Sequence, residues 1–541
     1  MIVGDIKKIS LSSSFFERTI AGGRLYIDKT RMIENFLTSE SEVNLVVRQR
    51  RLGKSMNMDM LQCFLTDRTD YRHLFKGLYI ESSPVWEKVN SAPVFSFDFK
   101  GLRASSYKND IRGQTIKHVC SMISPDDLDN YYKWRYNEIL TDDESVKDSL
   151  RFLTELAHGL TGKRSYLLID EYDKLLMDNF KSDKYEEIKT FETAMLSAAV
   201  KGNPYLEKAL LTGVMRISHE SMFSDLNNIK TFDLFRDEVF TDDYGITEEE
   251  ALELSQRAGF DINKVRTWYN GVRVNGKAIF NTYSMVSFIE HEAYDCYWGK
   301  SGTLDMIIDM LNDNRRMTIA NLLNGGKAEV FIDERISLTA LAQNNNDDAF
   351  YSLLVQAGYL ALEERFPEKS SAIVSIPNKE LNIVWKNFIL KNLYPDRVQL
   401  KTLFDNVDYP KIFAKDIEYF LNDRLSYHDL SVNSGEVREV THERAYHLYL
   451  LGLLSAYEDM RCRFPLSNRE SGNGRYDILV ERQDANYIFE LKGCKKEEDL
   501  EAKAVEAAEQ IDVKRYGADM GKRLVKLGVA FSGKRCRVYC L

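Results

Sequence analysis

The sequence predicts an α/β protein with an N-terminal parallel-sheet domain, a helical accessory region and a separate C-terminal α/β domain. Three observations lead to this prediction. The chain has 541 residues, and a single hydrophobic core usually stops growing near ~250–300 residues. Short apolar runs alternate with helical stretches up to about residue 240, and a second αβ pattern follows residue 400. We therefore expect domains at 1–240, 241–400 and 401–541.

The N-terminal segment has the pattern of a parallel sheet. Its candidate strands are apolar throughout, as strands are when helices cover both faces, and the intervening segments are long enough for crossover helices. From residue 241 the pattern becomes mostly helical, beginning where Glu250 follows Thr247 by three residues, a capping-box signature. The expected strands lie at 44–47, 93–98, 165–169 and 209–212.

The C-terminal segment is expected to fold as a second, mixed αβ domain. A helix precedes a candidate hairpin, and a long helix separates this hairpin from two final strands. The expected elements are a helix at 443–457, a hairpin at 476–490, a helix from about 497, and strands at 527–531 and 537–540.

The composition bounds the function classes. A formal net charge of −10 argues against bulk electrostatic coating by nucleic acid. From 511 to 541, however, eight Lys and Arg stand against two Asp, which predicts either a local basic surface or solvated helix faces. The start of the chain lacks the apolar core of a signal peptide, and no stretch reaches the ~20 apolar residues that span a bilayer. Seven cysteines without a CxxC pair support neither a zinc ribbon nor a disulfide framework. Together these features predict a cytoplasmic protein without a membrane partner.

Gly53, Lys54 and Ser55 directly follow a predicted strand and precede a helical stretch. In a phosphate-binding P-loop, backbone N–H groups and the helix N-terminus hold phosphates, the lysine neutralises the β- and γ-phosphate charge, and the serine binds Mg²⁺. The full pattern GxxxxGK[ST] would place a glycine at position 48, where this chain has Arg48. We expect these four residues to bind a nucleotide, although the Gly-Lys-Ser tripeptide alone is common.

Two later strand ends carry polar residues that would complete such a site. Asp170 and Glu171 follow one strand; in P-loop ATPases the first carboxylate holds the Mg²⁺ hydration sphere and the second polarises the attacking water. Thr212 ends another strand and is expected to sense the γ-phosphate, while Arg216 would neutralise transition-state charge. The alternative is that Asp170 caps a helix and Arg216 forms a surface ion pair. Because ligands of α/β sheets bind at the carboxyl ends of strands, the pattern favours a nucleotide site.

The segment 48–55, Arg-Gln-Arg-Arg-Leu-Gly-Lys-Ser, resembles the Arg-Pro-Arg-Arg-Phe-Gly-Lys-[Ser/Thr] loop of a bacterial and archaeal AAA-ATPase-like family whose members often carry a C-terminal PD-(D/E)XK nuclease domain. In that family arginine normally replaces the first glycine of the loop; here Gln49 and Leu52 replace its Pro and Phe. The resemblance implies ATP rather than GTP, and a homo-oligomer if Arg216 acts in trans. Further matches, which extend it over most of residues 5–300, lie at 26–30, 97–100, 211–213, 216–218 and 268–271.

Asp477, Glu490 and Lys492 are the candidate catalytic residues of the C-terminal domain. Because side chains alternate along a strand, Glu490 and Lys492 fall on one face, and a hairpin would bring Asp477 beside them. The two carboxylates would bind Mg²⁺ or Mn²⁺, which activates water and stabilises the charged transition state, and Lys492 would orient the water or neutralise that charge. The alternative is that these are solvated charges at a strand edge.

The order of these residues resembles the core of the PD-(D/E)XK nuclease superfamily over about residues 440–541. Glu443 precedes them on a helix, and Gln510 and Lys514 follow on the next helix. The proline of the motif name is missing, since Tyr476 stands before Asp477, but that position varies across the superfamily. The resemblance implies a DNA-cleaving site in which Glu443 is catalytic and Gln510 and Lys514 contact nucleic acid.

The motifs leave more than one function open. A zinc protease is disfavoured, because His442 and His447 are five residues apart and would point ~140° from each other on a helix. We expect an ATP-binding protein, an ATPase coupled to a Mg²⁺-dependent nuclease that hydrolyses DNA phosphodiester bonds. One alternative is a non-catalytic ATP-dependent switch that binds nucleic acid or a protein partner. Another is an active ATPase whose C-terminal domain is a relic.

Overall fold

The structure, a computed structural model, divides the chain into two compact units. The first comprises Met1–Trp298 and Glu329–Glu380, and the second comprises Gly299–Ala328 and Leu381–Leu541. The three-domain division at residues 240 and 400 stays a prediction. The structure describes residues 1–9, 15–217, 228–274, 276–298, 307, 310–323, 325–343, 346–393, 406–424, 446–447, 450–451, 453–454, 466–472, 474–482, 485–517, 520–533 and 535–541.

The first unit is built on a five-stranded sheet with the order β4-β5-β6-β3-β7, in which every neighbouring pair is parallel. The four predicted strands are present, which confirms the parallel α/β fold. Strand β7 was not predicted, because Ile-Lys-Thr-Phe is short and alternates in polarity instead of being apolar throughout. The strands are β3 (Val43–Val47), β4 (Val94–Asp98), β5 (Ser165–Asp170), β6 (Leu206–Gly213) and β7 (Ile229–Phe232).

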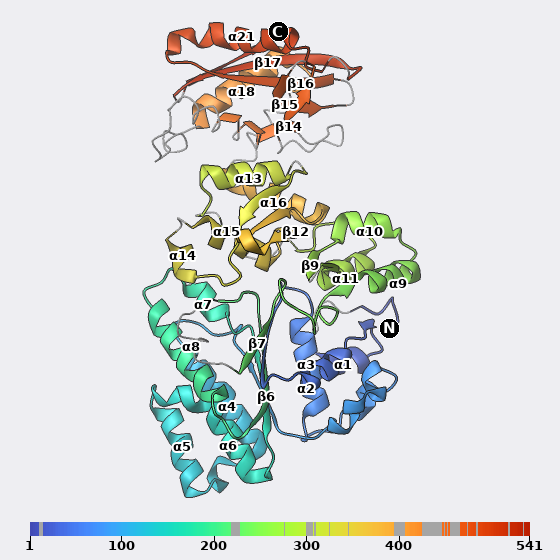
Figure 1. Ribbon diagram of the computed structural model, residues 1–541, viewed down its shortest axis with the longest axis vertical. Coiled ribbons are helices and arrows are strands. Elements are labelled where there is room, and N and C mark those ends of the chain that lie inside the picture. The colour runs from blue at the N-terminus through green and yellow to red at the C-terminus, as the bar shows by residue number, and fades with distance from the viewer. Residues whose placement is uncertain are drawn as a thin grey trace. The chain divides into compact units, whose positions relative to one another are not determined.

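Helices cover both faces of this sheet, which explains why all five residues of β3 are buried (Figure 1). Helices α2 (Arg31–Thr38) and α3 (Lys54–Leu65) lie on one face, and α4 (Tyr107–Met122), α6 (Ser149–Thr161) and α8 (Tyr185–Val200) lie on the other. The smaller elements are β1 (Ile2–Val3), α1 (Phe16–Ala21), β2 (Tyr26–Ile27), α5 (Asn130–Thr141) and α7 (Lys174–Asn179).

The region after residue 241 begins with the predicted capping box, which the structure confirms. Thr247 accepts the backbone N–H of Glu250, whose carboxylate accepts the N–H of Thr247 in return. The region is less helical than expected, because β8 and a β9–β10 hairpin form a three-stranded sheet. The Asn-Gly dipeptide at 275–276 in the sequence is a signal for such a hairpin, and Gly276, which precedes β10, has φ +79°. The elements are β8 (Ile246–Thr247), α9 (Glu248–Ala258), α10 (Ile262–Tyr269), β9 (Val272–Val274), β10 (Lys277–Phe280) and α11 (Thr282–His291).

Residues 329–375, which we call the 329–375 module, complete the first unit. A second three-stranded sheet, with the order β11-β13-β12, carries two helices. Its elements are β11 (Ala328–Phe331), α14 (Leu338–Ala342), α15 (Asp347–Ala357), β12 (Ala361–Phe366) and β13 (Ser371–Ser375).

The second unit contains a five-stranded mixed sheet whose strands follow chain order. Only the β16–β17 pair is parallel, because helix α21 (Leu500–Val513) connects these strands and crosses one face of the sheet, while α18 (Pro410–Arg424) covers the other (Figure 1). The expected hairpin, helix and final strands are therefore present. The strands are β14 (Leu466–Ser471), β15 (Gly474–Glu481), β16 (Ala485–Gly493), β17 (Arg523–Ser532) and β18 (Arg535–Cys540), and two further helices are α13 (Asp313–Leu323) and α16 (Lys379–Leu393).

The expected helix at 443–457 and the expected lack of a membrane-spanning helix can be compared only with the residues that the structure describes. Of the expected helix at 443–457, the structure describes 446–447, 450–451 and 453–454, all of them helical. Across the described ranges, no helix combines the length and the apolar character that crossing a bilayer requires.

Candidate nucleotide and nuclease sites

The loop between β3 and α3 is closed around the side chain of Lys54. Gly53 precedes the helix in the left-handed conformation, with φ +85°, which glycine adopts without strain. Lys54 Nζ donates to the carbonyl oxygens of Arg48 at 2.8 Å and of Gln49 at 2.7 Å. The lysine is therefore held inside the loop that would surround a phosphate, while Ser55 next to it is exposed.

Burial changes the proton affinity of Lys54. Removal from water lowers its pKa to about 8, against the opposing field of Asp170, Asp173 and Glu171. A negatively charged phosphate beside Nζ would favour the ammonium form and raise the pKa again.

The order of the sheet brings the other predicted nucleotide-site residues together. Because β6 lies between β3 and β5, the ends of these three strands are adjacent. Ser55 Oγ donates to Asp170 Oδ2 at 2.5 Å, and Thr212 Oγ1 donates to Asp170 Oδ1. The hydroxyl and the carboxylate that the sequence assigns to Mg²⁺ are thus in direct contact, with the predicted sensor on the other carboxylate oxygen.

Glu171 follows in an uncommon backbone conformation. Its φ is +54°, and such a left-handed conformation costs a non-glycine residue about 1 kcal/mol or more. Burial and the neighbouring Asp170 raise the pKa of the Glu171 carboxyl, which suits a group that polarises water.

Asp173 is a structural contributor to this site that the motif search missed. Its carboxylate accepts the backbone N–H groups of Val214 and Met215, both at 2.8 Å, and it is 2% exposed. It therefore joins the loop after β5, which contains Glu171, to the loop after β6, which contains Arg216. The only sequence signal was its place three residues after Asp170.

Arg48 has a buried side chain that turns away from Lys54. Its guanidinium forms an ion pair with Asp237 and donates to the carbonyls of Val47 at 2.8 Å and Phe232 at 3.2 Å. Burial lowers its pKa to about 10. In this structure only its backbone carbonyl meets Lys54, so its predicted part in nucleotide binding would be carried by the backbone.

Arg216 pairs with acidic residues of the same unit. Its Nη1 lies 3.5 Å from Asp233 Oδ2 and 4.0 Å from Glu334 Oε2. These contacts agree with the alternative that Arg216 forms an ion pair, and its action on a nucleotide, in cis or in trans, stays a prediction.

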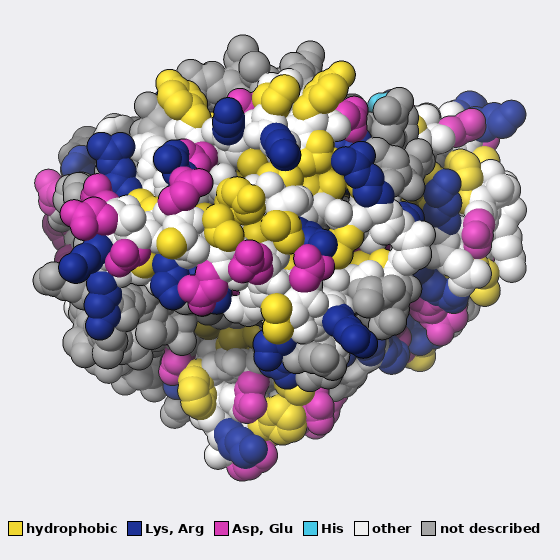
Figure 2. Space-filling model, turned by 90° about the horizontal axis from the view of Figure 1, so that it is seen from above, with side chains coloured by type: hydrophobic (Ala, Val, Ile, Leu, Met, Phe, Trp, Pro, Cys, Tyr) yellow, Lys and Arg dark blue, Asp and Glu magenta, His cyan; other side chains and the backbone are white. Residues whose placement is uncertain are grey.

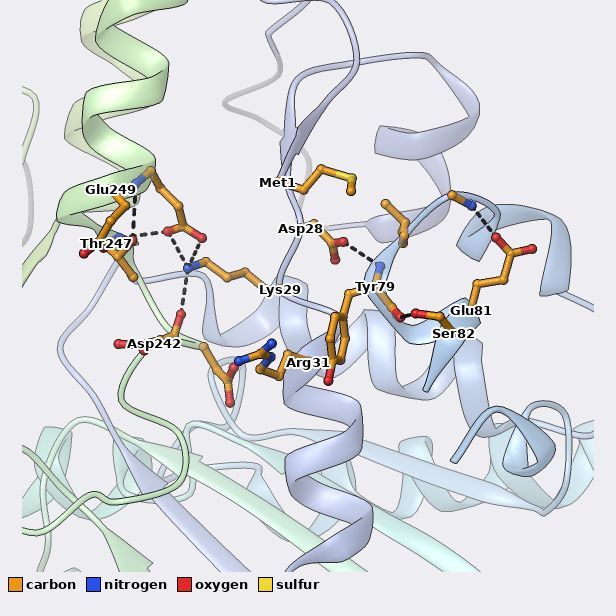
Figure 3. Close-up of a pocket in the computed structure, with 14 residues that line it drawn as sticks. Met1, Asp28, Lys29, Arg31, Tyr79, Glu81, Ser82, Asp242, Thr247 and Glu249 are labelled. Carbon is orange, nitrogen blue, oxygen red and sulfur yellow. Dashed lines mark hydrogen bonds and ion pairs between the residues drawn. The ribbon is translucent and has the colours of Figure 1, made fainter. Parts of the chain in front are cut away.

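Asp28 and Lys29, from the segment 26–30, one of the family-like matches, line a cavity of about 590 Å³ (Figure 3). Lys29 Nζ donates to both carboxylate oxygens of Glu250, at 2.9 and 2.7 Å, and to Asp242 O at 2.7 Å. Asp28 Oδ2 accepts the N–H of Tyr79 at 2.8 Å on the other side. The segment thus ties the start of α2 to the start of α9.

In the second unit, Asp477 and Glu490 lie on paired strands. The antiparallel register of β15 and β16 pairs Ile478 with Phe489, which sets the two carboxylates opposite each other on the next rung. Gln510 of α21 donates to Glu490, and Asp477 lies opposite Glu490 in this register, so both side chains are on the face that α21 covers. Asp477 Oδ2 accepts the N–H of Leu491 at 2.7 Å, and burial raises the pKa of Asp477.

Helix α21 supplies partners for the remaining site residues. Gln510 Nε2 donates to Glu490 Oε1, and Lys492 Nζ donates to Glu506 Oε1 at 2.6 Å. The contacts with Lys492 and Lys503 lower the pKa of Glu506 to about 2. The approach of the helix depends on Gly528, opposite Glu490 on β17, where a Cβ would lie 1.9 Å from the carbonyl oxygen of Ala504. Gln510 and Glu506, four residues apart, therefore face the site together.

The remaining predictions for this domain have mixed outcomes. Glu443 and His442 lie outside the described residues, whereas His447 Nε2 is 3.1 Å from the backbone oxygen of Asp477. Within the described ranges, no three His, Cys, Asp or Glu side chains gather closely enough to hold a metal ion. Asp477 and Glu490 therefore form a pair of carboxylates rather than a larger set there.

Some charges of the basic C-terminal segment are paired with carboxylates, and the basic surface that the sequence suggests stays a prediction. Lys526 pairs with Asp512, and Arg537 pairs with Glu418 and Glu501, while Lys514 is exposed. Figure 2 shows Lys and Arg side chains interspersed with Asp and Glu on the face it presents.

Comparison with known proteins defines the class of protein. Residues 10–223 match the family model described as a predicted AAA-ATPase, and residues 441–539 match that of the PD-(D/E)XK nuclease superfamily. The chain thus carries a predicted AAA-ATPase domain followed by a PD-(D/E)XK nuclease superfamily domain. It is also similar, with 24% identity over 97% of this chain and 96% of the relative, to an uncharacterized protein in the vnfD 5' region of Azotobacter chroococcum mcd 1.

Proposed function

We propose that this protein is an ATPase that controls a Mg²⁺-dependent DNA nuclease. The observation that carries the nuclease half is the pairing of Asp477 with Glu490 across two strands, with Lys492 on the same face. The nucleotide half is supported by the contacts that join Ser55 and Thr212 to Asp170.

At the nucleotide site, each residue has a distinct task. Lys54 would exchange its two carbonyl acceptors for β- and γ-phosphate oxygens, and Ser55 and Asp170 would hold Mg²⁺. Glu171 would accept the proton of the attacking water, and Thr212 would contact the γ-phosphate or that water. ATP, rather than another nucleotide, is the proposed ligand on the strength of the family resemblance.

At the nuclease site, the carboxylates fit a divalent cation. Carboxylate oxygens are the ligands that Mg²⁺ and Mn²⁺ prefer, and among the described residues no hydrogen bond reaches Asp477 Oδ1. A bound cation would lower the pKa of a water and offset charge on the scissile phosphate. Gln510 would fix the orientation of Glu490, and Lys492 would neutralise phosphate charge once it leaves Glu506.

A cleavage assay tests both halves. Plasmid, linear and single-stranded DNA, with RNA in parallel, are incubated with protein, Mg²⁺ or Mn²⁺, and with or without ATP. We expect metal-dependent cleavage that Asp477→Ala removes and that responds to ATP in the parent protein but not in Lys54→Ala. Cleavage that persists in Asp477→Ala would contradict the proposal, as would the absence of cleavage under every condition.

One observation favours a second candidate, a non-catalytic ATP-dependent switch that binds nucleic acid or a protein partner. Lys492, which a nuclease would use on the phosphate, is held by Glu506 in this structure. Under that alternative the wild-type protein binds DNA without cutting it, and Glu490→Ala binds equally well. A gel-shift assay in parallel with the cleavage assay separates the two candidates.

A further inference from the structure

The 329–375 module is attached to the segment that follows β6. The backbone N–H of Ile336 donates to Arg216 O at 3.0 Å, and Ile217 forms an isolated parallel bridge with Ile336. The side chain of Gln356, at the end of α15, adds two hydrogen bonds to this connection. Its Oε1 accepts the N–H of Arg216 at 3.0 Å, and its Nε2 donates to Glu334 O at 3.0 Å.

This connection is buried and charged. Gln356 is 1% exposed, so neither of its hydrogen bonds competes freely with water. The Arg216 guanidinium joins the same contact through Glu334, whose carboxylate also pairs with Arg236 at 3.2 Å and with Arg365. The module therefore contacts both the backbone and the side chain of Arg216, which lies four residues after the predicted sensor Thr212.

A second contact joins the module to the nucleotide loop itself. Gly358 caps α15 with φ +89°, and a Cβ at this position would lie 2.3 to 2.7 Å from the side-chain atoms of Gln49. Gln49 is 7% exposed, and its carbonyl oxygen accepts Lys54 Nζ at 2.7 Å. The end of α15 therefore rests directly on a residue that holds the P-loop lysine.

We propose that the 329–375 module reads the nucleotide state of the first unit, with Gln356 and Gly358 as the positioning residues. A phosphate that draws Lys54 away from the Gln49 carbonyl changes the loop on which Gly358 rests. A γ-phosphate near Thr212 acts on the loop that Gln356 holds. The inference rests on the proposed ATP binding, and it assigns the response to contacts within one chain.

Thermodynamic linkage makes this proposal testable by affinity. If nucleotide binding changes the free energy of the contact between the module and the loop, a variant that alters this contact must change the free energy of nucleotide binding by the same coupling. Gly358→Ala presses a methyl group on Gln49, whereas Gly259→Ala provides a matched control. Gly259 also caps a helix, α9, with φ +76°, but a Cβ there meets no atom within 4 Å. Both variants carry the strain of a left-handed alanine, and only one touches the loop.

The experiment measures the Kd of Mg²⁺-ATP and of a non-hydrolysable analogue by calorimetry for the full chain. We expect Gly358→Ala to weaken binding about tenfold and Gly259→Ala to change it less than about twofold. In a Gln49→Ala background, the effect of Gly358→Ala should shrink, since the side chain it presses on is gone. Equal affinities of Gly358→Ala and Gly259→Ala would overturn the inference.

A second variant keeps the test decisive if Gly358→Ala does not fold. Hydrogen exchange of peptides covering α15 is measured with and without the analogue, in the parent protein and in Gln356→Ala. We expect nucleotide to change the protection of α15 in the parent and to change it much less in Gln356→Ala. If the parent protein binds the analogue but the protection of α15 does not change, the inference is wrong and the proposed function stands. If the parent protein does not bind the analogue, the proposed function is wrong.

Discussion

The two candidate sites are held together in different ways. At the nucleotide site the polar groups bind one another: the buried Lys54 binds loop carbonyls, and the half-buried Asp170 accepts the hydroxyls of the exposed Ser55 and the buried Thr212. At the C-terminal site the central lysine is held by an exposed carboxylate of α21, Glu506, whose side chain is 50% exposed. The difference teaches that nucleotide binding and folding stability are linked at the first site. At the second site a DNA phosphate can replace Glu506 as the partner of Lys492 with little loss of folding free energy.

The largest effect is expected at the C-terminal carboxylates. Asp477→Asn removes a charge that would bind the metal but keeps the shape of the side chain. We expect cleavage to fall about 10³-fold, equivalent to about 4 kcal/mol of transition-state stabilisation, with little change in the unfolding midpoint. Initial cleavage rates and circular dichroism measure the two quantities. Asp512→Asn, which removes an exposed carboxylate paired with Lys526, is the control and should leave the rate unchanged.

The buried ion pair behind the nucleotide loop should respond in stability instead. The side chains of Arg48 and Asp237 are 1% and 0% exposed. Asp237→Asn would leave a buried guanidinium without its counter-charge, and we expect the free energy of unfolding to fall by about 3 kcal/mol. Urea denaturation measures this. Asp242→Asn, which breaks an ion pair with Lys277 at the surface, should cost less than about 1 kcal/mol, and equal losses in the two variants would contradict the comparison.

Nucleotide affinity should depend on pH through Lys54. In the free protein burial lowers its pKa to about 8, and a bound phosphate would raise it, so ATP binding takes up a proton around pH 8. Affinity is then highest below pH 8 and weakens as the pH rises, by up to about tenfold per pH unit. Calorimetry at pH 8 in buffers of different ionisation enthalpy measures the proton uptake. Lys54→Arg should abolish it, and an affinity that is constant from pH 7 to 9.5 would refute this account.

The smallest effect is expected at the exposed end of the C-terminal site. Glu506→Gln removes the charge that holds Lys492, but an exposed ion pair contributes only about 0–1 kcal/mol to folding. We therefore expect a change in unfolding free energy below about 1 kcal/mol together with tighter DNA binding, because Lys492 is released toward the phosphate. Fluorescence anisotropy measures the affinity. Weaker DNA binding would show that Glu506 positions Lys492 instead of competing for it.

Local patterns in the sequence were enough to predict much of the fold and to single out residues that the structure brings together at both candidate sites. Buried parallel strands are apolar throughout, so four of the five strands of the first sheet could be placed. The rule that parallel strands present their carboxyl ends at one edge placed Ser55 and Asp170 in one site, and the structure brings them into contact. The alternation of side chains along strands likewise placed Asp477, Glu490 and Lys492 on one face.

The partners of these residues could not be predicted in the same way. Asp237, Gln356 and Glu506 carry no motif, and each acts through a contact with a residue distant in sequence. Arg48 illustrates the consequence: its loop position suggested a nucleotide ligand, but only tertiary packing reveals that Asp237 holds its side chain. Such contacts depend on how elements pack, which a local pattern does not encode.

Glu250 has a consequence for local unfolding in the first unit. One carboxylate both completes the capping box of α9 and binds Lys29, which is 221 residues away in the chain. The first turn of α9 and the segment before α2 therefore cannot fray independently, since loosening either one releases the other. We expect amide protons in the two segments to exchange with solvent in a single opening event, as one cooperative unit whose formation must close a long loop. The start of the chain would then complete its folding only after residue 250 is in place.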